Sequence, residues 1–321
     1  MASRSRKIWL GVVVAVVAAG FWLYTPDLDR AELEARYLEA PADLRTVLGT
    51  RLHVRDSGPR QAPAVLMVHG FGSSLHTWDA WADVLEDEWR IIRLDLPGAG
   101  LSGPDITSDY TDERSHALLI ALLDQLGVQR AAVVGHSIGG RIAWSFAAQH
   151  PERVDKLVLV APDGFASPGF EYGSAPEVPA SLALMRYVLP ESILRMNLEV
   201  AYGDPSRLSD ELAQTYHDLL RAPGNRDALL QRLQQTVLRN PVPLLEQVQV
   251  PVLLMWGEAD GMIPVANSAD YQRHLDNVRL VRLPGLGHVP HEEAPAETVG
   301  HVQAFLRDPP AVAVATGQPR A

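Results

Sequence analysis

Short apolar runs alternate with helical patterns through most of this chain. The runs at 64–70, 90–98, 130–137, 156–162, 250–258 and 278–285 predict buried strands, and most of them end in glycine, proline or a polar residue. Residues 112–127, 139–154 and 294–307 instead have helical patterns. Strands that are apolar on both faces and alternate with helices predict a parallel sheet covered by helices on both sides.

One long interval interrupts this alternation. Between the strand that ends near Val160 and the strand that begins near Val252, the sequence has helical patterns and no convincing strand. A structureless loop of that length would be unusual in a compact domain. We therefore expect a helical cap at 165–242, inserted over one end of the sheet, with the core formed by 46–164 and 243–307.

The N-terminal region has a different pattern. A basic tail at 1–7 precedes residues 8–26, which carry no charge and have aromatic residues near both ends. As a helix this stretch would be about 28 Å long, close to the ~30 Å hydrocarbon core of a bilayer. With acidic residues after it, the segment predicts a single-pass transmembrane anchor and a catalytic body on the extracytoplasmic side. The alternative is a signal peptide, cleaved near Gly20, and a secreted protein.

The two flanking segments are polar or low in complexity. Residues 27–45 are charged with helical spacing and predict a stalk, whereas 308–321 are small, proline-bearing and aperiodic and predict a disordered tail. The 321 residues are 47% apolar, with a formal net charge of −11 and no cysteine. The acidic balance argues against a nucleic-acid partner, and the missing cysteines exclude thiol nucleophiles and disulfides.

The stretch "VVGHSIGGRIA" places a serine between glycines where a predicted strand meets a predicted helix. Gly135, Ser137 and Gly139 fit the pattern G-x-S-x-G. At such a turn the serine backbone is strained, its hydroxyl emerges at the carboxyl edge of the sheet, and side chains at the glycine positions would collide with neighbours. Ser137 is therefore the candidate nucleophile.

A serine nucleophile needs a base, and the base needs an orienting acid. His288, in "GLGH", follows the last predicted strand, and Asp260, in "WGEADGMIP", follows the one before it, so both should reach the edge that holds Ser137. Asp163, in "APDG", is the alternative acid. The backbone N–H groups of Phe71, in "HGFG", and Ile138 are the candidate oxyanion hole.

These motifs, together with the turn "DLPGAGLS" at 95–102, resemble the α/β-hydrolase superfamily, in its serine-nucleophile esterase/lipase-like branch. The resemblance covers roughly 46–307 and implies a Ser137–His288–Asp260 triad that needs no cofactor and no metal. We interpret His69 and His136 as packing residues around the turn and His291 as a residue of the rim.

The substrate is less well determined by the sequence. The apolar cap, with Met185 and Met196 as candidate pocket residues, favours a small hydrophobic carboxylic ester. The first alternative is a carbon–carbon bond hydrolase of ring-fission products. The carboxylates of such substrates need a fixed arginine, for which the candidates are Arg141, Arg186 and Arg195. The second alternative is a non-enzymatic, ligand-binding member of the fold. Trp144 and Phe146 are expected in the core.

Overall fold

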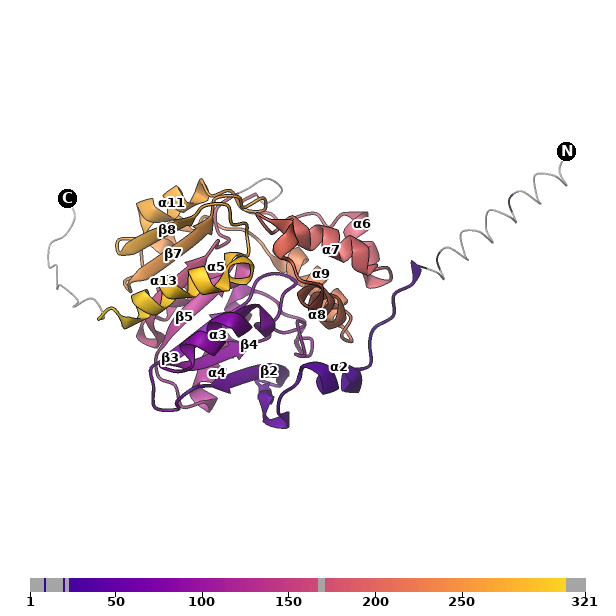
Figure 1. Ribbon diagram of the computed structural model, residues 1–321, viewed down its shortest axis with the longest axis horizontal. Helices are drawn as coiled ribbons and strands as arrows, with labels where there is room; N and C mark the ends of the chain where they lie inside the picture. Colours follow the sequence, from indigo (N-terminus) through magenta and orange to yellow (C-terminus); the bar gives the residue numbers. More distant parts are fainter. Residues whose placement is uncertain (1–8, 10–19, 21–22, 167–170, 310–321) are drawn as a thin grey trace.

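The computed structural model describes residues 9, 20, 23–166 and 171–309. In this part of the chain one eight-stranded sheet has the order β1-β2-β4-β3-β5-β6-β7-β8 (Figure 1). The strands are β1 Leu44–Val47, β2 Thr50–Ser57, β3 Ala64–Val68, β4 Arg90–Leu94, β5 Ala131–His136, β6 Val154–Val160, β7 Val252–Gly257 and β8 Val278–Leu283. The strands from β3 to β8 run parallel and match the six predicted strands.

Helices cover both faces of the sheet because its strands are apolar on both sides. On β3, Leu66 packs into the cluster formed with α4 Asp112–Gln125 and α5 Ile138–Gln149. The next residue, Met67, packs into the opposite cluster, formed with α3 Asp79–Leu85 and α13 Pro295–Arg307. The mostly parallel, helix-covered sheet predicted from the sequence is confirmed.

The β1–β2 hairpin was not predicted. It is joined by a two-residue turn in which Leu48 and Gly49 have φ values of 46° and 83°, so both central residues are left-handed. Val47, Leu52 and Val54 are fully buried against the sheet core. Their alternation with polar residues was the available signal, but it is short and borders the charged segment before it.

Residues 27–45 contain a helix, α2 Arg30–Tyr37, that is packed against the domain. Leu33 is fully buried in a cluster with Leu101 and Leu219. The Arg36 guanidinium and the Tyr37 hydroxyl both donate hydrogen bonds to the carboxylate of Asp218, at 2.7 and 2.9 Å. This segment therefore belongs to the folded domain and does not stand apart from it as a stalk.

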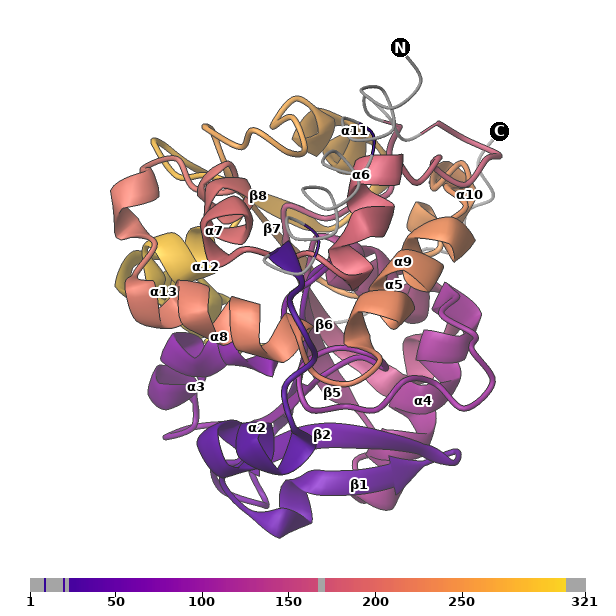
Figure 2. The same cartoon turned by 90° about the vertical axis from the view of Figure 1, so that its right-hand side faces the viewer.

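The described chain between β6 and β7 contains helices and no strand, as the sequence predicted. They are α6 Ala180–Ala183, η4 Leu184–Arg186, α7 Glu191–Glu199, η5 Pro205–Arg207, α8 Asp210–Leu220, α9 Asn225–Gln235 and α10 Val242–Leu245. The helices α6 to α9 form a cap beside the sheet (Figures 1 and 2). The cap has an apolar cluster of its own, which includes Met185, Leu194 and Leu230.

Among the described residues, no helix is both long and apolar enough to cross a membrane. Most of the predicted anchor at 8–26 and most of the predicted tail at 308–321 lie outside the described residues. Both therefore stay predictions.

Candidate active site

Ser137 occupies a sharp turn between β5 and α5. Its backbone has φ 53° and ψ −121°, a combination that costs a non-glycine residue on the order of 1–3 kcal/mol. The turn is held by hydrogen bonds from Ser137 N to Val160 O, at 3.1 Å, and from Asp163 N to Ser137 O, at 3.0 Å. The backbone N–H groups of the first turn of α5 have no partner within the helix and lie beside the serine.

The glycines around Ser137 are required by close contacts. A Cβ atom added at Gly135 would lie 2.2 Å from the carbonyl oxygen of Gly139. One added at Gly139 would lie 2.4 Å from the carbonyl oxygens of Val68 and His69. These separations are far below van der Waals contact, so both positions exclude any side chain, as the sequence predicted.

His288 and Asp260 meet at the carboxyl ends of β8 and β7. The Nδ1 atom of His288 lies 2.8 Å from Oδ2 of Asp260. The second carboxylate oxygen of Asp260 accepts hydrogen bonds from the backbone N–H groups of Met262 and Ile263, each at 2.8 Å. Because Nδ1 is engaged by the carboxylate, Nε2 is the imidazole nitrogen left for proton transfer.

The alternative acid, Asp163, has a different partner. Its Oδ2 atom accepts a hydrogen bond from Nη1 of Arg141, at 3.1 Å, and makes none with His288. Burial raises the pKa of Asp163 although Arg141 opposes this shift. The geometry therefore pairs Asp260, and not Asp163, with the imidazole of His288.

His288 is brought beside Ser137 by a backbone contact. His136 is the residue before the serine, and the Nε2 atom of its ring lies 2.9 Å from the carbonyl oxygen of His288. In the part of the chain that the structure describes, Ser137 Oγ makes no hydrogen bond with His288. Such bonds often tighten only when the substrate is bound.

The loop that follows β3 lies against the serine. A Cβ atom added at Gly70 would lie 3.3 Å from the Cβ of Ser137. Within the described residues, neither the N–H of Phe71 nor that of Ile138 donates a hydrogen bond. Two backbone donors near one serine are what an oxyanion hole needs.

The other histidines near the turn are buried and lack the charge partner of His288. His69 accepts a hydrogen bond at Nε2 from Leu96 N, at 2.9 Å, and burial lowers its pKa. Burial also places the pKa of His136 well below its usual value. Our interpretation of His291 as a rim residue was wrong: its ring is fully buried and stacks on Trp78 at 4.4 Å.

Sequence reasoning missed Glu292, which lies in the short helix α12 Pro290–Glu293 just after His288. Its carboxylate accepts hydrogen bonds from the hydroxyls of Thr77, Tyr202 and Tyr216. The two tyrosines belong to the cap, and Tyr216 OH also lies 3.1 Å from Oγ of Ser73. Burial raises the pKa of Glu292, whereas these hydroxyls and the nearby His288 lower it. No local pattern marks this residue, because its partners are distant in the sequence.

The candidate arginines are all paired with carboxylates of the described chain. Arg141 is buried between Asp112 and Asp163. Arg186 pairs with Asp227 at 2.6 Å, and Arg195 pairs with Glu199 and Asp210. No arginine of the three is therefore free to receive a substrate carboxylate.

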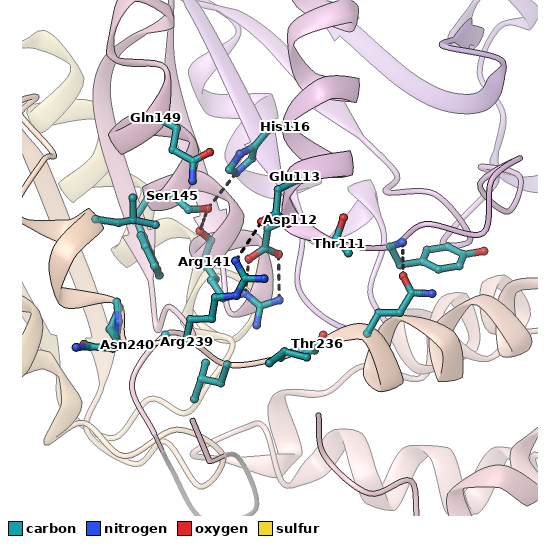
Figure 3. Close-up of a pocket in the computed structure, with 18 residues that line it drawn as sticks. Thr111, Asp112, Glu113, His116, Arg141, Ser145, Gln149, Thr236, Arg239 and Asn240 are labelled. Carbon is teal, nitrogen blue, oxygen red and sulfur yellow. Dashed lines mark hydrogen bonds and ion pairs between the residues drawn. The ribbon is translucent and has the colours of Figure 1, made fainter. Parts of the chain in front are cut away.

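A cavity of about 240 Å³ lies between the N-terminal part of α4, α5 and the chain that follows α9 (Figure 3). Arg141, Trp144 and Thr236 help to line it, but Ser137, Asp260 and His288 do not. Trp144 and Phe146 are buried in the sheet core, as expected, and Trp144 has one edge on this cavity.

The space between the loop after β3 and the cap is much smaller, about 20 Å³. It is lined by Gly72, Ser73, Tyr216, Leu219 and Leu229, among others, and is mostly apolar. Met185 is buried within the cap, whereas Met196 is exposed, so Met196 is not the pocket residue that we expected. Among the described residues, no group of three or more acidic or histidine side chains could hold a metal ion.

Comparison with known proteins agrees with this fold. The chain belongs to the alpha/beta hydrolase fold family, whose model matches residues 63–295, and is a hydrolase of that fold.

Two curated relatives and one solved structure illustrate the range of similar proteins. An uncharacterized hydrolase of Bacillus subtilis (strain 168), YugF, is 29% identical over 280 residues, which are 84% of this chain and 100% of that protein. The 2-hydroxy-6-oxononadienedioate/2-hydroxy-6-oxononatrienedioate hydrolase of Comamonas testosteroni is 27% identical over 265 residues, 80% of this chain and 89% of that protein. The crystal structure of a membrane phospholipase A, a bacterial virulence factor, aligns with a TM-score of 0.70 and 27% identity, over 94% of this chain and 98% of that one.

Proposed function

We propose that this protein is a membrane-anchored serine hydrolase that cleaves carboxylic esters of hydrophobic substrates through an acyl-enzyme on Ser137. The observation that carries the proposal is the 2.8 Å contact between His288 Nδ1 and Asp260 Oδ2, on loops that meet at the strained serine turn. In this arrangement an imidazole is held in one tautomer and can deprotonate a serine hydroxyl.

The reaction proceeds in two halves. Ser137 Oγ attacks the ester carbonyl carbon while Nε2 of His288 takes the hydroxyl proton, and the N–H groups of Phe71 and Ile138 stabilise the oxyanion by ~3 kcal/mol each. The tetrahedral intermediate collapses, and the leaving alcohol receives the proton from His288. Water then gives a proton to His288 and attacks the acyl-enzyme. His288 returns this proton to Ser137 Oγ as the second tetrahedral intermediate collapses, which releases the carboxylic acid and restores the free enzyme.

The paired arginines favour an ester over the carbon–carbon bond alternative. A ring-fission product carries carboxylates that need a cationic partner, and Arg141, Arg186 and Arg195 are each engaged by acidic side chains. The small space between the loop after β3 and the cap is lined mainly by apolar atoms, which is consistent with a hydrophobic substrate. Because the chain is also similar to the dienedioate hydrolase of Comamonas testosteroni, carbon–carbon bond hydrolysis is the alternative to be tested.

The apolar N-terminal segment and the likeness to a membrane phospholipase A support the membrane anchor and an extracytoplasmic body. The anchor is tested by fractionation: an anchored chain stays in the membrane pellet after a carbonate wash, and external protease reaches its body. A mature chain that begins near Gly20 would mean export with cleavage. A body protected from protease in intact cells would contradict export altogether.

The chemistry is tested by labelling with a fluorophosphonate probe. We expect wild-type protein to be labelled and Ser137→Ala to remain unlabelled. Hydrolysis of esters of graded chain length, compared with a ring-fission dienoate, then separates the two reaction classes. A well-folded wild-type protein that is not labelled would favour a ligand-binding role.

A further inference from the structure

The outward side of cap helix α7 is apolar. Ile193, Met196 and Val200, spaced by three and four residues, follow one side of the helix and its end, and each is between 47% and 59% exposed. On the inward side, Leu194 is buried in the cap cluster, with Leu198 packed against it. The helix is therefore apolar both toward the cap interior and toward solvent.

The turn η4, which precedes α7 in the chain, also carries exposed apolar side chains. Leu184 and Tyr187 are 58% and 59% exposed, whereas Met185 between them is buried in the same cap cluster as Leu194. We call these five exposed residues the outer cap face: Leu184, Tyr187, Ile193, Met196 and Val200. Exposed large apolar side chains that recur on one part of a soluble domain are a candidate contact surface.

The chain that follows the apolar N-terminal segment is attached to this same face. Thr25 donates its N–H to the carbonyl oxygen of Tyr187, at 2.8 Å, and its hydroxyl accepts a hydrogen bond from Leu189 N, at 3.0 Å. Arg226 of α9 contacts the carbonyl oxygen of Thr25 and the carboxylate of Asp27. We call residues 24–27 the strap. The strap contains the last residues of the uncharged segment 8–26, so this segment joins the domain at the outer cap face.

We propose that the outer cap face lies on the surface of the lipid bilayer, where its apolar side chains enter the headgroup boundary. This inference rests on the membrane anchor of the proposed function, because that segment would hold the strap at the membrane. Tyr24, which is 56% exposed and donates its N–H to Gly20 O, is an aromatic residue at the junction. The net charge of −11 makes attraction to anionic lipid a weak cause, so apolar insertion is the dominant one.

The outer cap face also adjoins the loop that carries Asp260. A Cβ atom added at Gly261 would lie 3.3 Å from the carbonyl oxygen of Val200, and the next residue, Met262, is 54% exposed. A lipid-contacting α7 would thus place the edge of the active site beside the bilayer. A hydrophobic ester could then enter without crossing bulk water.

The absence of cysteine from the chain permits a direct test. Ile193→Cys, Met196→Cys and the control Glu152→Cys each give the full chain one thiol for an environment-sensitive fluorophore. Glu152 lies in η3 Pro151–Arg153, which comes directly before β6, whereas the cap follows β6. Glu152 and the cap are therefore at opposite ends of this strand. The labelled chains are reconstituted in phosphatidylcholine vesicles, with and without a lipid-borne quencher, and flotation verifies that the protein is bound.

We expect fluorescence at 193 and 196 to be quenched in vesicles at low and high salt, and fluorescence at 152 to remain unquenched. Floated protein with no quenching at 193 or 196 would overturn the proposal while leaving the anchor intact. Protein that does not float would overturn both. Shielding of 193 and 196 without lipid, increasing with protein concentration, would identify a second copy of the chain as the occupant and also overturn it.

Hydrolysis rates of two variants give a second, independent test of the lipid contact. We expect Met196→Glu to lower hydrolysis of a vesicle-borne ester several-fold and to leave hydrolysis of a short, water-soluble ester unchanged. Val84→Glu is the matched control, because Val84 is 40% exposed on α3 and does not belong to the outer cap face. Equal rates of the two variants on vesicles would contradict the proposal.

Discussion

Tyr216 donates a hydrogen bond of 2.7 Å to Glu292 across the boundary between cap helix α8 and the short helix that follows His288. Because the tyrosine hydroxyl has one proton and gives it to the carboxylate, Ser73 must be the donor in its 3.1 Å contact with Tyr216. A single carboxylate thus connects the cap, the loop after β3 and the segment that carries His288.

We expect Tyr216→Phe to destabilise the protein by about 1.5–3 kcal/mol, because it leaves a largely buried carboxylate with one donor fewer. Urea unfolding measures this loss. Glu292→Gln removes the charge and replaces one of the two acceptor oxygens by an NH₂ donor, which already weakens the contact with Tyr216. Adding it to Tyr216→Phe should therefore cost less than the sum of the two single changes. Fully additive effects would mean that the contact contributes little.

Ser137→Ala and His288→Ala should each abolish ester turnover and leave the thermal unfolding curve close to that of the wild type. Both side chains lie on loops at the sheet edge, outside the two core clusters. Since triad members act as a unit, the double variant should be barely slower than either single one. Substantial turnover by Ser137→Ala would disprove the assigned nucleophile.

The two candidate acids should respond differently to removal of their charge. Asp260→Asn should lower kcat by a factor on the order of 10⁴, because the amide no longer holds the imidazole in the required tautomer. Asp163→Asn should affect kcat much less and stability more, because it removes a charge partner of the buried Arg141. Steady-state kinetics and unfolding of both variants check this, and reversed effects on kcat would move the acid to the loop after β6.

Stability should fall as the solution becomes more acidic than about pH 6.5, the ordinary pKa of histidine. Burial and the nearby His288 lower the pKa of His291 to about 3, so the unfolded chain binds a proton that the folded chain excludes. The contribution of neutral His291 is complete above pH 6.5 and is lost as the pH falls towards 3, at no more than about 1.4 kcal/mol per pH unit. Urea unfolding at pH 7, 6 and 5 should show a shallower slope for His291→Gln than for the wild type.

Two helical glycines provide a matched pair. Gly139→Ala would push a methyl group against the carbonyl oxygens of Val68 and His69. This overpacking should lower the free energy of unfolding by about 1–3 kcal/mol. Gly300→Ala, in α13, meets nothing within 4 Å and should stabilise the protein by up to about 1 kcal/mol. Thermal unfolding of the two variants compares them, and a harmless Gly139→Ala would refute the steric reason given for the turn.

Much of the fold could be predicted because the parallel strands are apolar on both faces and each ends in a recognisable turn. The same property predicts from the sequence that Ser137, Asp260 and His288 lie at one edge of the sheet. The choice between Asp260 and Asp163 required geometry, because both follow parallel strands and only their partners differ. The packing of α2 was missed because Leu33 is the one buried residue of this helix, and the partly buried Tyr37 that packs beside it lies in the same charged sequence.

Two parts of the cap, α8 on one side and α6 with η4 on the other, are attached to the rest of the protein in different ways. Helix α8 is pinned to the rest of the protein through Tyr216 and through Asp218, which binds Arg36 and Tyr37 of α2. The hydrogen bonds and ion pairs of α6, η4 and the turn after them lead, within the described chain, only to the strap and to other cap residues. If the site opens to admit a long acyl chain, we expect α8 to stay in place and the α6–η4 part of the cap to move, with the strap as its hinge.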